Sequence, residues 1–360
     1  MIFIHIVSLI IGISLVLVTL SSAVKTFVLP RSAPDWLTWS VFKSVRTIFS
    51  IILLPTKTYR QRDRIMAFYA PISLLLLVPV WLSLTTLGFT AIFWSLGVES
   101  LNAAFRLSGS SIMTLGSEIS QSLIQTVLVL AAATIGLILI ALLIAYLPTM
   151  YAAFARREIL VNLLEVRAGD PPSAVEMLLR FHRIHGLSQL TEQWTAWENW
   201  FSDLEESHTS LPALVFFRSP KPEHSWVTAS AAILDAAALT LSCVDVANSP
   251  NAALCIRAGY LALRSISDYF GVPYDPDPHY PEIQISVTRN EFEDALDTLA
   301  RNGVPLKIDR EQSWKDYAGW RVNYDKPLLG LVHITMAPNA PWTGIRSEKD
   351  FFPPLVLKQG

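Results

Sequence analysis

The sequence predicts an all-α membrane protein, with three transmembrane helices, a re-entrant loop between the second and third of them, and an α-helical cytoplasmic domain. The 360 residues are 52% apolar and only 16% charged, whereas an average globular chain is roughly 25% charged. The charges are also divided unevenly. Residues 1–150 hold nine basic and four acidic side chains, and the remainder holds 19 and 26. This division excludes a single soluble domain and a largely disordered chain. The two cysteines, Cys243 and Cys255, provide neither a disulfide framework nor metal-ligand spacing.

Three apolar stretches are long enough to cross a bilayer, since about 20 apolar residues span about 30 Å of hydrocarbon as a helix. The first runs from Ile2 to Val24, and the others are uncharged from Ile65 to Val98 and from Ile119 to Ala155. The last two exceed one crossing, so we expect tilt or continuation beyond the bilayer. A cleaved signal peptide is the alternative for the first stretch, because small residues stand at Ser21-Ser22-Ala23, although no basic residue precedes the apolar run.

The basic residues predict the orientation, because Lys and Arg accumulate in short cytoplasmic loops beside membrane spans. Residues 25–64 carry eight basic and two acidic side chains, and Arg156, Arg157 and Arg167 follow the third span. Both segments are therefore expected in the cytoplasm. The protein is predicted to be multi-pass, with its N-terminus outside and its C-terminal domain cytoplasmic.

The basic loop contains a helical pattern of its own. Apolar residues recur near helical spacing between Trp36 and Ile52, while Lys43 and Arg46 fall on another side. The pattern indicates either an amphipathic helix lying among lipid headgroups or a helix packed on the neighbouring spans.

Polar residues interrupt the apolar mass from Glu99 to Glu118, between the second and third spans. This stretch is too short and too polar to cross a bilayer, and it ends in Thr114-Leu115-Gly116-Ser117-Glu118. Irregular backbone at membrane depth is tolerated where it is buried in protein or lines a water-filled cavity. We expect a short helix whose C-terminal dipole favours cations, followed by carbonyl groups that replace the hydration water of an ion.

The stretch Ser108-Gly109-Ser110-Ser111-Ile112-Met113-Thr114-Leu115-Gly116 resembles the pore loop of bacterial one-pore potassium-channel-type proteins. More specifically, the chain is similar to a group of bacterial potassium-channel-like membrane proteins with a helical cytoplasmic domain. Further segments carry this likeness, in order, from about Lys25 to about Phe270: Leu29–Arg31, Phe68–Pro71, Tyr146–Tyr151, Ala155–Glu158, Val166–Pro172, Glu206–His208, Phe217–Ser219, Ser225–Trp226 and Ile233–Asp235.

The resemblance implies that Thr114, Leu115, Gly116, Ser117 and Glu118 form the ion pathway. It also implies passive cation permeation, with potassium as the expected permeant ion, through a homotetramer in the bacterial inner membrane, since one loop per chain cannot enclose a central pathway. Glu118 stands where the family's filter has a second glycine, and a β-carbon there costs about 1–2 kcal/mol in the left-handed conformation. Altered or lost potassium selectivity is therefore expected. The alternative is a non-conducting pseudochannel that acts as a membrane scaffold or sensor through its cytoplasmic domain.

The charged residues of the loop have two interpretations each. Glu118 is either part of a ring of glutamates that attracts cations or a solvated acid at the N-terminus of the third span. Arg106 near the pathway would repel cations, or it pairs with Glu99 or Glu118 or contacts a lipid headgroup.

The third span holds two candidates for a gating hinge. Gly136 stands where a bend would help opening, and its alternative role is close helix packing. Pro148 lies at the inner end, where a kink or a passage into the cytoplasmic helix is expected.

The predicted organisation follows from these boundaries. It comprises a first transmembrane helix (1–24), a basic cytoplasmic loop with an interfacial helix (25–64), a channel-like pore module with its pore loop at 99–118 (65–148), a cytoplasmic helical domain (149–271), and a Pro-rich linker with further helices and a loose tail from Ser347 (272–360).

The cytoplasmic half reads as amphipathic helices over about 187–206, 226–246, 252–269, 288–302 and 311–331. Trp194, Trp197 and Trp200 share one face, which indicates a buried core face before a ligand cage. Asp235 lies in an apolar helix and is expected to be paired there or placed near the helix N-terminus, since a lone buried carboxylate is costly.

No arrangement in this half supports enzymatic chemistry. The pair His182 and His185 lacks a nearby third ligand, and the acidic residues between Asp275 and Glu282 lie in a Pro-rich stretch that reads as a stiff linker. Likewise, no nucleophile with an adjacent base is present. We therefore expect no enzyme, no metal, no cofactor and no nucleic-acid partner. The expected partners are the lipid bilayer and further copies of the chain, and no motif specifies a cytoplasmic ligand.

Overall fold

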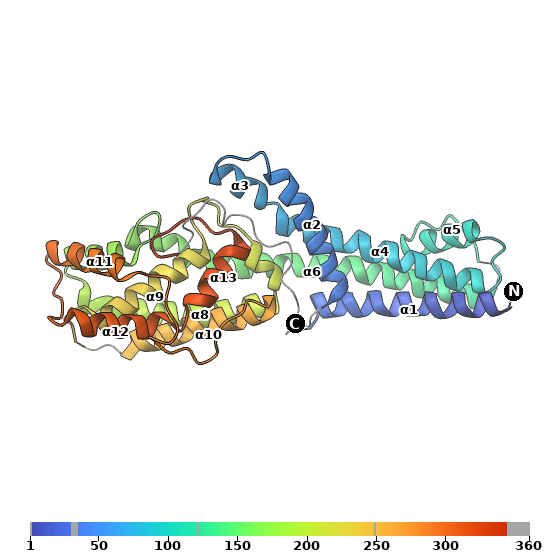
Figure 1. The fold of residues 1–360 in the computed structure, drawn as a ribbon. Helices are drawn as coiled ribbons and strands as arrows, with labels where there is room; N and C mark the ends of the chain where they lie inside the picture. Colours follow the sequence, from blue (N-terminus) through green and yellow to red (C-terminus); the bar gives the residue numbers. More distant parts are fainter. Residues whose placement is uncertain (1, 30–34, 121, 248–249, 344–360) are drawn as a thin grey trace. The chain divides into compact units, whose positions relative to one another are not determined.

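The structure is a computed structural model that describes residues 2–29, 35–120, 122–247 and 250–343 (Figure 1). Throughout these ranges the secondary structure is helical, apart from one isolated bridge between Val244 and Leu306. The prediction of an all-helical protein is confirmed. The tail predicted from Ser347 lies outside the described residues. The chain divides into two compact units: unit 1 is Met1–Thr56 with Ile65–Ala152, and unit 2 is Lys57–Arg64 with Ala153–Gly360.

Among the described residues, three segments are long and apolar enough to cross a membrane, as predicted. They are Ile2–Phe27, which is α1; Tyr59–Ser95, which includes α3 (Tyr59–Met66) and α4 (Tyr69–Ser95); and Leu123–Ala168, which is α6. At 1.5 Å per residue, the 46 residues of α6 extend about 69 Å, roughly twice the hydrocarbon thickness. The charged C-terminal part of α6, which belongs to unit 2, therefore extends beyond any bilayer that its apolar part crosses.

Within unit 1, α1 and α4 pack as an antiparallel pair at a glycine contact. A β-carbon on Gly12 would lie only 2.6 Å from the carbonyl oxygen of Gly88, so no larger residue fits. Ser8 donates a hydrogen bond of 3.0 Å to the Ala91 carbonyl nearby. Small residues that allow close backbone approach are typical of helix pairs in membranes.

The helix α2 (Trp36–Leu53) begins at Asp35, whose carboxylate accepts hydrogen bonds from the Thr38 amide and from the hydroxyl of Ser22 on α1. Its buried residues, among them Val45 and Phe49, face the other helices of unit 1, and Phe49 contacts Tyr69 of α4. Other apolar side chains of α2 are exposed: Trp36, Ile48, Ile51 and Ile52. The helix thus has one face packed on the neighbouring helices and a second apolar face free, so it combines features of both sequence interpretations.

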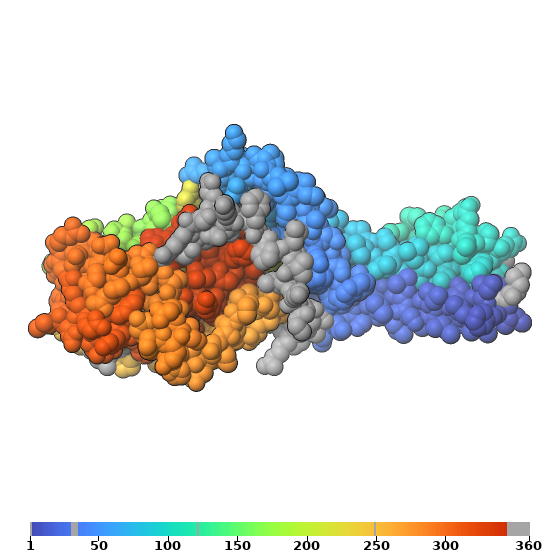
Figure 2. All heavy atoms as spheres, viewed as in Figure 1, coloured from blue at the N-terminus to red at the C-terminus, as the bar shows by residue number. Residues whose placement is uncertain are grey.

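The apolar surfaces of unit 1 are distributed unequally among the three candidate spans. In the most apolar window, half of the α4 residues are buried, whereas only 17% are buried in α1 and in α6. The side chains of α1 form a continuous surface along its length (Figure 2). Exposed apolar surface of this extent requires lipid or another protein surface to cover it.

Unit 2 is a helical domain built around α9 (Trp226–Ser242), in which every residue from Trp226 to Thr240 is buried. Alanines at 231, 232 and 236–238 allow close approach of its neighbours. The surrounding helices are α7 (Ala174–Arg183), α8 (Leu190–Ser210), α10 (Pro250–Phe270), α11 (Arg289–Arg301), α12 (Arg310–Arg321) and α13 (Asp325–Thr335), with short 3-10 turns at Leu187–Gln189 and Pro212–Phe216. Trp194, Trp197 and Trp200 of α8 are buried, which confirms the predicted core face.

The predicted helix over 311–331 is wrong in one respect, because the structure has two helices there, α12 and α13, separated at residues 322–324. Pro327 explains the break. Proline lacks an N–H and clashes with the carbonyl four residues earlier in a helix interior, but it is tolerated in the first turn, where α13 places it.

Candidate functional site

The predicted loop begins with α5 (Leu101–Ile112), which is capped by the Ser100 side chain. Its 12 residues span about 18 Å, too little to cross a bilayer. The buried hydroxyl of Ser108 donates a hydrogen bond of 2.7 Å to the carbonyl of Thr86 on α4. This bond and the buried face of α5, which includes Ala104 and Leu107, hold the short helix on the second span.

The helix α5 ends in a Schellman-type cap that places Thr114 in the left-handed conformation, with φ of 53°. The amide of Leu115 donates to the carbonyl of Ser110, and the amide of Thr114 donates to that of Ser111. Glycine is the usual residue at this position, and a β-branched residue is strained there. The strain lies at the first residue of the predicted ion pathway, where strained backbone is often functional.

The buried Ser110 side chain closes the loop that follows. Its hydroxyl oxygen accepts hydrogen bonds from the amide and the hydroxyl of Ser117, at 3.0 and 3.1 Å. Gly116 between them has φ of 67° with open space around it. Thr114, Leu115 and Gly116 are exposed residues, and in the part of the chain that the structure describes no group donates a hydrogen bond to their carbonyls. The turn therefore presents unused carbonyl oxygens on one chain.

Gly136 of α6 lies directly against the end of α5. A β-carbon at Gly136 would stand 2.2 Å from the carbonyl oxygen of Ile112, so the contact depends on glycine. Pro148 lies further along the same helix, which continues through it to Ala168. The structure thus brings Gly136 close to the loop and leaves Pro148 about three turns away. Close packing at Gly136 is observed, and a hinge at either residue stays a prediction.

Two charged residues of the loop form an ion pair. Arg106 of α5 contacts Glu118 at 2.5 Å, with 67% of the arginine and 26% of the glutamate side chain exposed. Glu118 was one of the two partners expected for Arg106. The pair is neutral, so a ring of glutamates would attract cations only after Arg106 releases Glu118.

A second set of polar residues lies in the core of unit 2. Both oxygens of the buried Asp235 carboxylate accept hydrogen bonds of 2.7 Å from Arg321, and one of them also accepts from the hydroxyls of Tyr317 and Tyr324. Arg321 in turn contacts the buried Asp325 at 2.8 Å. The expected pairing of Asp235 is confirmed. A cavity of about 220 Å³ borders this cluster and is lined by Asp235, Glu291, Asp294 and Trp342, among others.

Burial sets the ionisation of this cluster. It raises the pKa of Asp235, and the charge of Arg321 opposes that shift. Burial acts to lower the pKa of Arg321, but the carboxylates of Asp235 and Asp325 raise it well above its usual value. The arginine therefore stays charged, and the network joins α9, α12 and α13 as a fixed ion cluster.

Within unit 2, the buried Arg157 holds the C-terminal part of α6 against the segment between α8 and α9. Its guanidinium donates to Glu158, to the carbonyls of Leu214 and Phe217, and to Nε2 of His208 at 3.2 Å. Because arginine only donates, Nε2 of His208 accepts and the proton lies on Nδ1. Burial and the charge of Arg157 hold the pKa of His208 well below its usual value.

The predicted absence of a metal site rested on sequence spacing, and the structure brings together residues that spacing does not reveal. Among the described residues, Glu165, Asp170 and His224 form a group whose potential ligand atoms lie within 4.8 Å of one another. The sequence gives no sign of this group beyond the turn at Gly169-Asp170-Pro171, because His224 reaches it from a distant loop. His182 and His185, by contrast, form no such group with any other residue that the structure describes.

Comparison with known protein families, characterised proteins and solved structures finds no match for this chain. The geometry of its own residues therefore has to support any assignment of function.

Proposed function

We propose that this chain is an integral membrane protein whose α5 and following turn form a re-entrant loop beside a passive cation pathway. The observation that carries the proposal is the short helix between two membrane-crossing candidates, ending in a turn with unused carbonyls at Thr114, Leu115 and Gly116. Carbonyl oxygens of this kind can replace the hydration shell of a monovalent cation such as potassium. Glu118 stands where potassium-channel filters have a second glycine, so we expect weakened potassium selectivity.

The pathway requires several copies of the chain. One loop cannot enclose an axis, so a closed ring is needed, and we propose a homotetramer. The exposed apolar residues of α6, among them Leu130, Leu137 and Ile144, supply surface for contact between copies and with lipid. In the proposed topology the chain lies in the bacterial inner membrane, with the N-terminus outside and unit 2 in the cytoplasm, as the basic residues favour.

Cation flux into liposomes tests the proposal. Full-length protein is reconstituted and uptake of K⁺, Na⁺ and Ca²⁺ is measured against empty liposomes and against Gly116→Trp. We expect flux for at least one cation that Gly116→Trp abolishes. Gly116→Ala is expected to reduce it, because alanine is strained at φ of 67°. Gly109→Ala is the matched control, since Gly109 lies in α5 with open space around it. No flux above the Gly116→Trp level for any of the three cations would contradict a channel.

One observation favours the alternative, a non-conducting membrane scaffold or sensor. The Arg106–Glu118 pair places a cation beside the proposed pathway. If the reconstituted protein is oligomeric but carries no cation, unit 2, with its cavity beside Asp235, becomes the functional part.

A further inference from the structure

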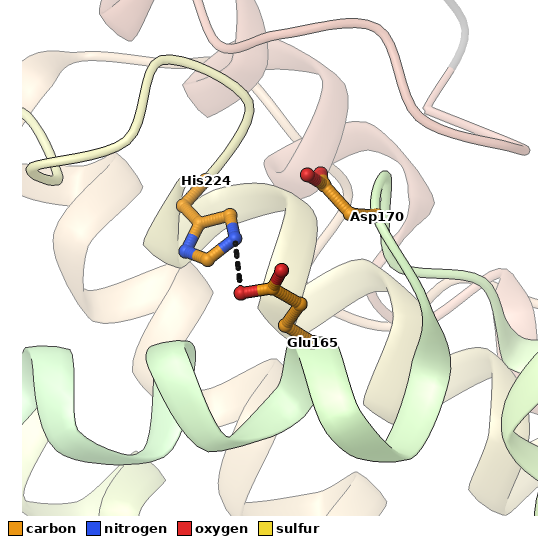
Figure 3. A group of neighbouring side chains, drawn as sticks. All are labelled: Glu165, Asp170 and His224. Carbon is orange, nitrogen blue, oxygen red and sulfur yellow. Dashed lines mark ion pairs between the residues drawn. The ribbon is translucent and has the colours of Figure 1, made fainter.

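The Glu165, Asp170 and His224 group has the chemistry of a metal site. Glu165 lies near the end of α6, Asp170 in the turn after it, and His224 in the loop before α9, and their side chains converge (Figure 3). One nitrogen and two carboxylate oxygens are ligands that suit Zn²⁺ or Mn²⁺, with a further position left for water. All three residues belong to unit 2.

His224 supplies an independent observation. The residue is only 7% exposed, and its Nε2 is buried without a hydrogen-bond partner. Its Nδ1 lies 3.2 Å from Oδ1 of Asn162, which accepts the Nδ1 proton. In the neutral imidazole that bond leaves a lone pair on Nε2, which lies 3.5 Å from Oε2 of Glu165. A lone pair facing a carboxylate oxygen is joined to it by a cation between them, either a proton on Nε2 or a metal ion, and a metal-bound histidine is usually oriented by a hydrogen bond from its other nitrogen.

The distances between the potential ligand atoms are compatible with a bound metal ion. Ligand atoms about 2.1 Å from a tetrahedral metal lie about 3.4 Å apart, close to the 3.5 Å between His224 and Glu165. Asp170 is exposed and needs only a small movement to approach, since its oxygen is within 4.8 Å of the other ligand atoms. The exposed side of the group gives an ion access from solvent.

Lys221 is the competing cation. Its ammonium group contacts Oε2 of Glu165, and 53% of its side chain is exposed. Glu165 raises the pKa of Lys221, and Asp170 contributes to that shift. A metal ion would displace this flexible side chain into solvent, so Lys221 sets how tightly the ion binds.

We propose that Glu165, Asp170 and His224 bind one divalent transition-metal ion, of the Zn²⁺ or Mn²⁺ class, with Asn162 orienting the histidine. The proposal is independent of cation permeation, because all of its residues lie outside the loop at 114–118. It also departs from the sequence expectation that the chain has no metal site.

Equilibrium binding of Zn²⁺, Mn²⁺ and Mg²⁺ to chelator-treated, full-length protein in detergent tests the site, with Co²⁺ absorption as a report on the coordination geometry. We expect one equivalent of Zn²⁺ to bind more tightly than Mg²⁺. His224→Gln should weaken binding by about 100-fold or more, and Asn162→Ala by about 10- to 100-fold. Lys221→Gln should strengthen it several-fold, a change that misfolding cannot produce.

The matched control is the double variant His182→Ala/His185→Ala, which removes two histidines outside the group and should leave Zn²⁺ affinity unchanged. Equal affinity for Mg²⁺ and Zn²⁺, absence of stoichiometric binding, or unchanged binding in His224→Gln would overturn the proposal. In the last two cases Lys221 alone would be the counter-ion of Glu165.

Discussion

The balance of charge at the proposed pathway depends on two residues, Arg106 and Glu118, which form a pair at 2.5 Å. Removing one partner leaves the other uncompensated near the loop. The two single substitutions should therefore change cation permeation in opposite directions, even though an exposed pair contributes little to stability.

We expect Arg106→Gln to raise cation flux several-fold in liposomes, because it frees the Glu118 carboxylates to attract cations. Glu118→Gln should lower flux, since Arg106 then lies unpaired beside the pathway. Equal flux in both variants would show that neither charge faces the ions, and it would leave the carbonyl groups of the turn as the remaining determinants.

A buried histidine predicts how the stability of unit 2 depends on pH. Burial, together with the charge of Arg157, holds the pKa of His208 below the value of 6.5 that it has when unfolded. Well above pH 6.5 both states are neutral and the full stability is present. As pH falls below 6.5, the unfolded state binds a proton that the folded state does not, so stability falls by up to about 1.4 kcal/mol per pH unit.

Thermal melting of the full chain between pH 7.5 and 5 measures this effect. The wild-type melting temperature should fall in that window, and part of the fall should be absent in His208→Gln, which keeps a group able to accept from Arg157. Identical pH profiles for the two proteins would assign the loss of stability to other groups.

At the scale of helices, the contact between α5 and α6 distinguishes packing from hinge motion at Gly136. A methyl group there would approach the Ile112 carbonyl to 2.2 Å, and backbone cannot move aside as a flexible side chain does. Gly136→Ala should therefore destabilise the protein by about 1–3 kcal/mol, the usual cost of overpacking.

The measurement is the melting temperature of the detergent-solubilised protein, with Gly109→Ala as control, because that glycine meets nothing within 4 Å and alanine favours the helix. An unchanged melting temperature in Gly136→Ala, combined with altered flux, would support the hinge in place of the packing role.

The elements show which features the sequence could predict. Long apolar runs and helical periodicity are local, so the three spans, α8, α9 and the short helix before Thr114 were predictable from composition and spacing. The break before α13 was missed although Pro327 signals it. The closing of the loop by Ser110 and the group around His224 depend on which distant side chains meet, and no spacing along the chain encodes those contacts.

The basic residues that predict the orientation include one whose charge has another explanation. Arg157 counted toward the orientation as a positive charge beside the third span, yet its side chain is buried and bonds the carbonyls of Leu214 and Phe217. These hydrogen bonds explain the presence of Arg157 at this position without reference to the membrane. The exposed Arg156 and the basic residues of α2 are the better indicators of which side of the membrane unit 2 occupies.

At the scale of the whole molecule, the exposed surface of α6 predicts assembly. Neighbouring residues on this helix differ in solvent exposure: Ile138 is 47% exposed, whereas Leu139 is fully buried within one chain. If copies of α6 meet around an axis, a cysteine at Ile138 should form a disulfide between chains, and one at Leu139 should not. The natural cysteines do not interfere, because both are buried and burial raises the pKa of Cys243 to about 12, which leaves almost no reactive thiolate.

Mild oxidation of membranes, followed by non-reducing electrophoresis, measures this pairing. We expect Ile138→Cys to run mainly as a dimer of chains and Leu139→Cys and wild type as single chains, while the native mass of the solubilised protein corresponds to four. A fourfold ring joins chains only in pairs through a single cysteine each, so dimers on the gel and tetramers in solution are the consistent result. Single chains in both measurements would mean that lipid alone covers α6, and a pathway enclosed by several copies would then be excluded.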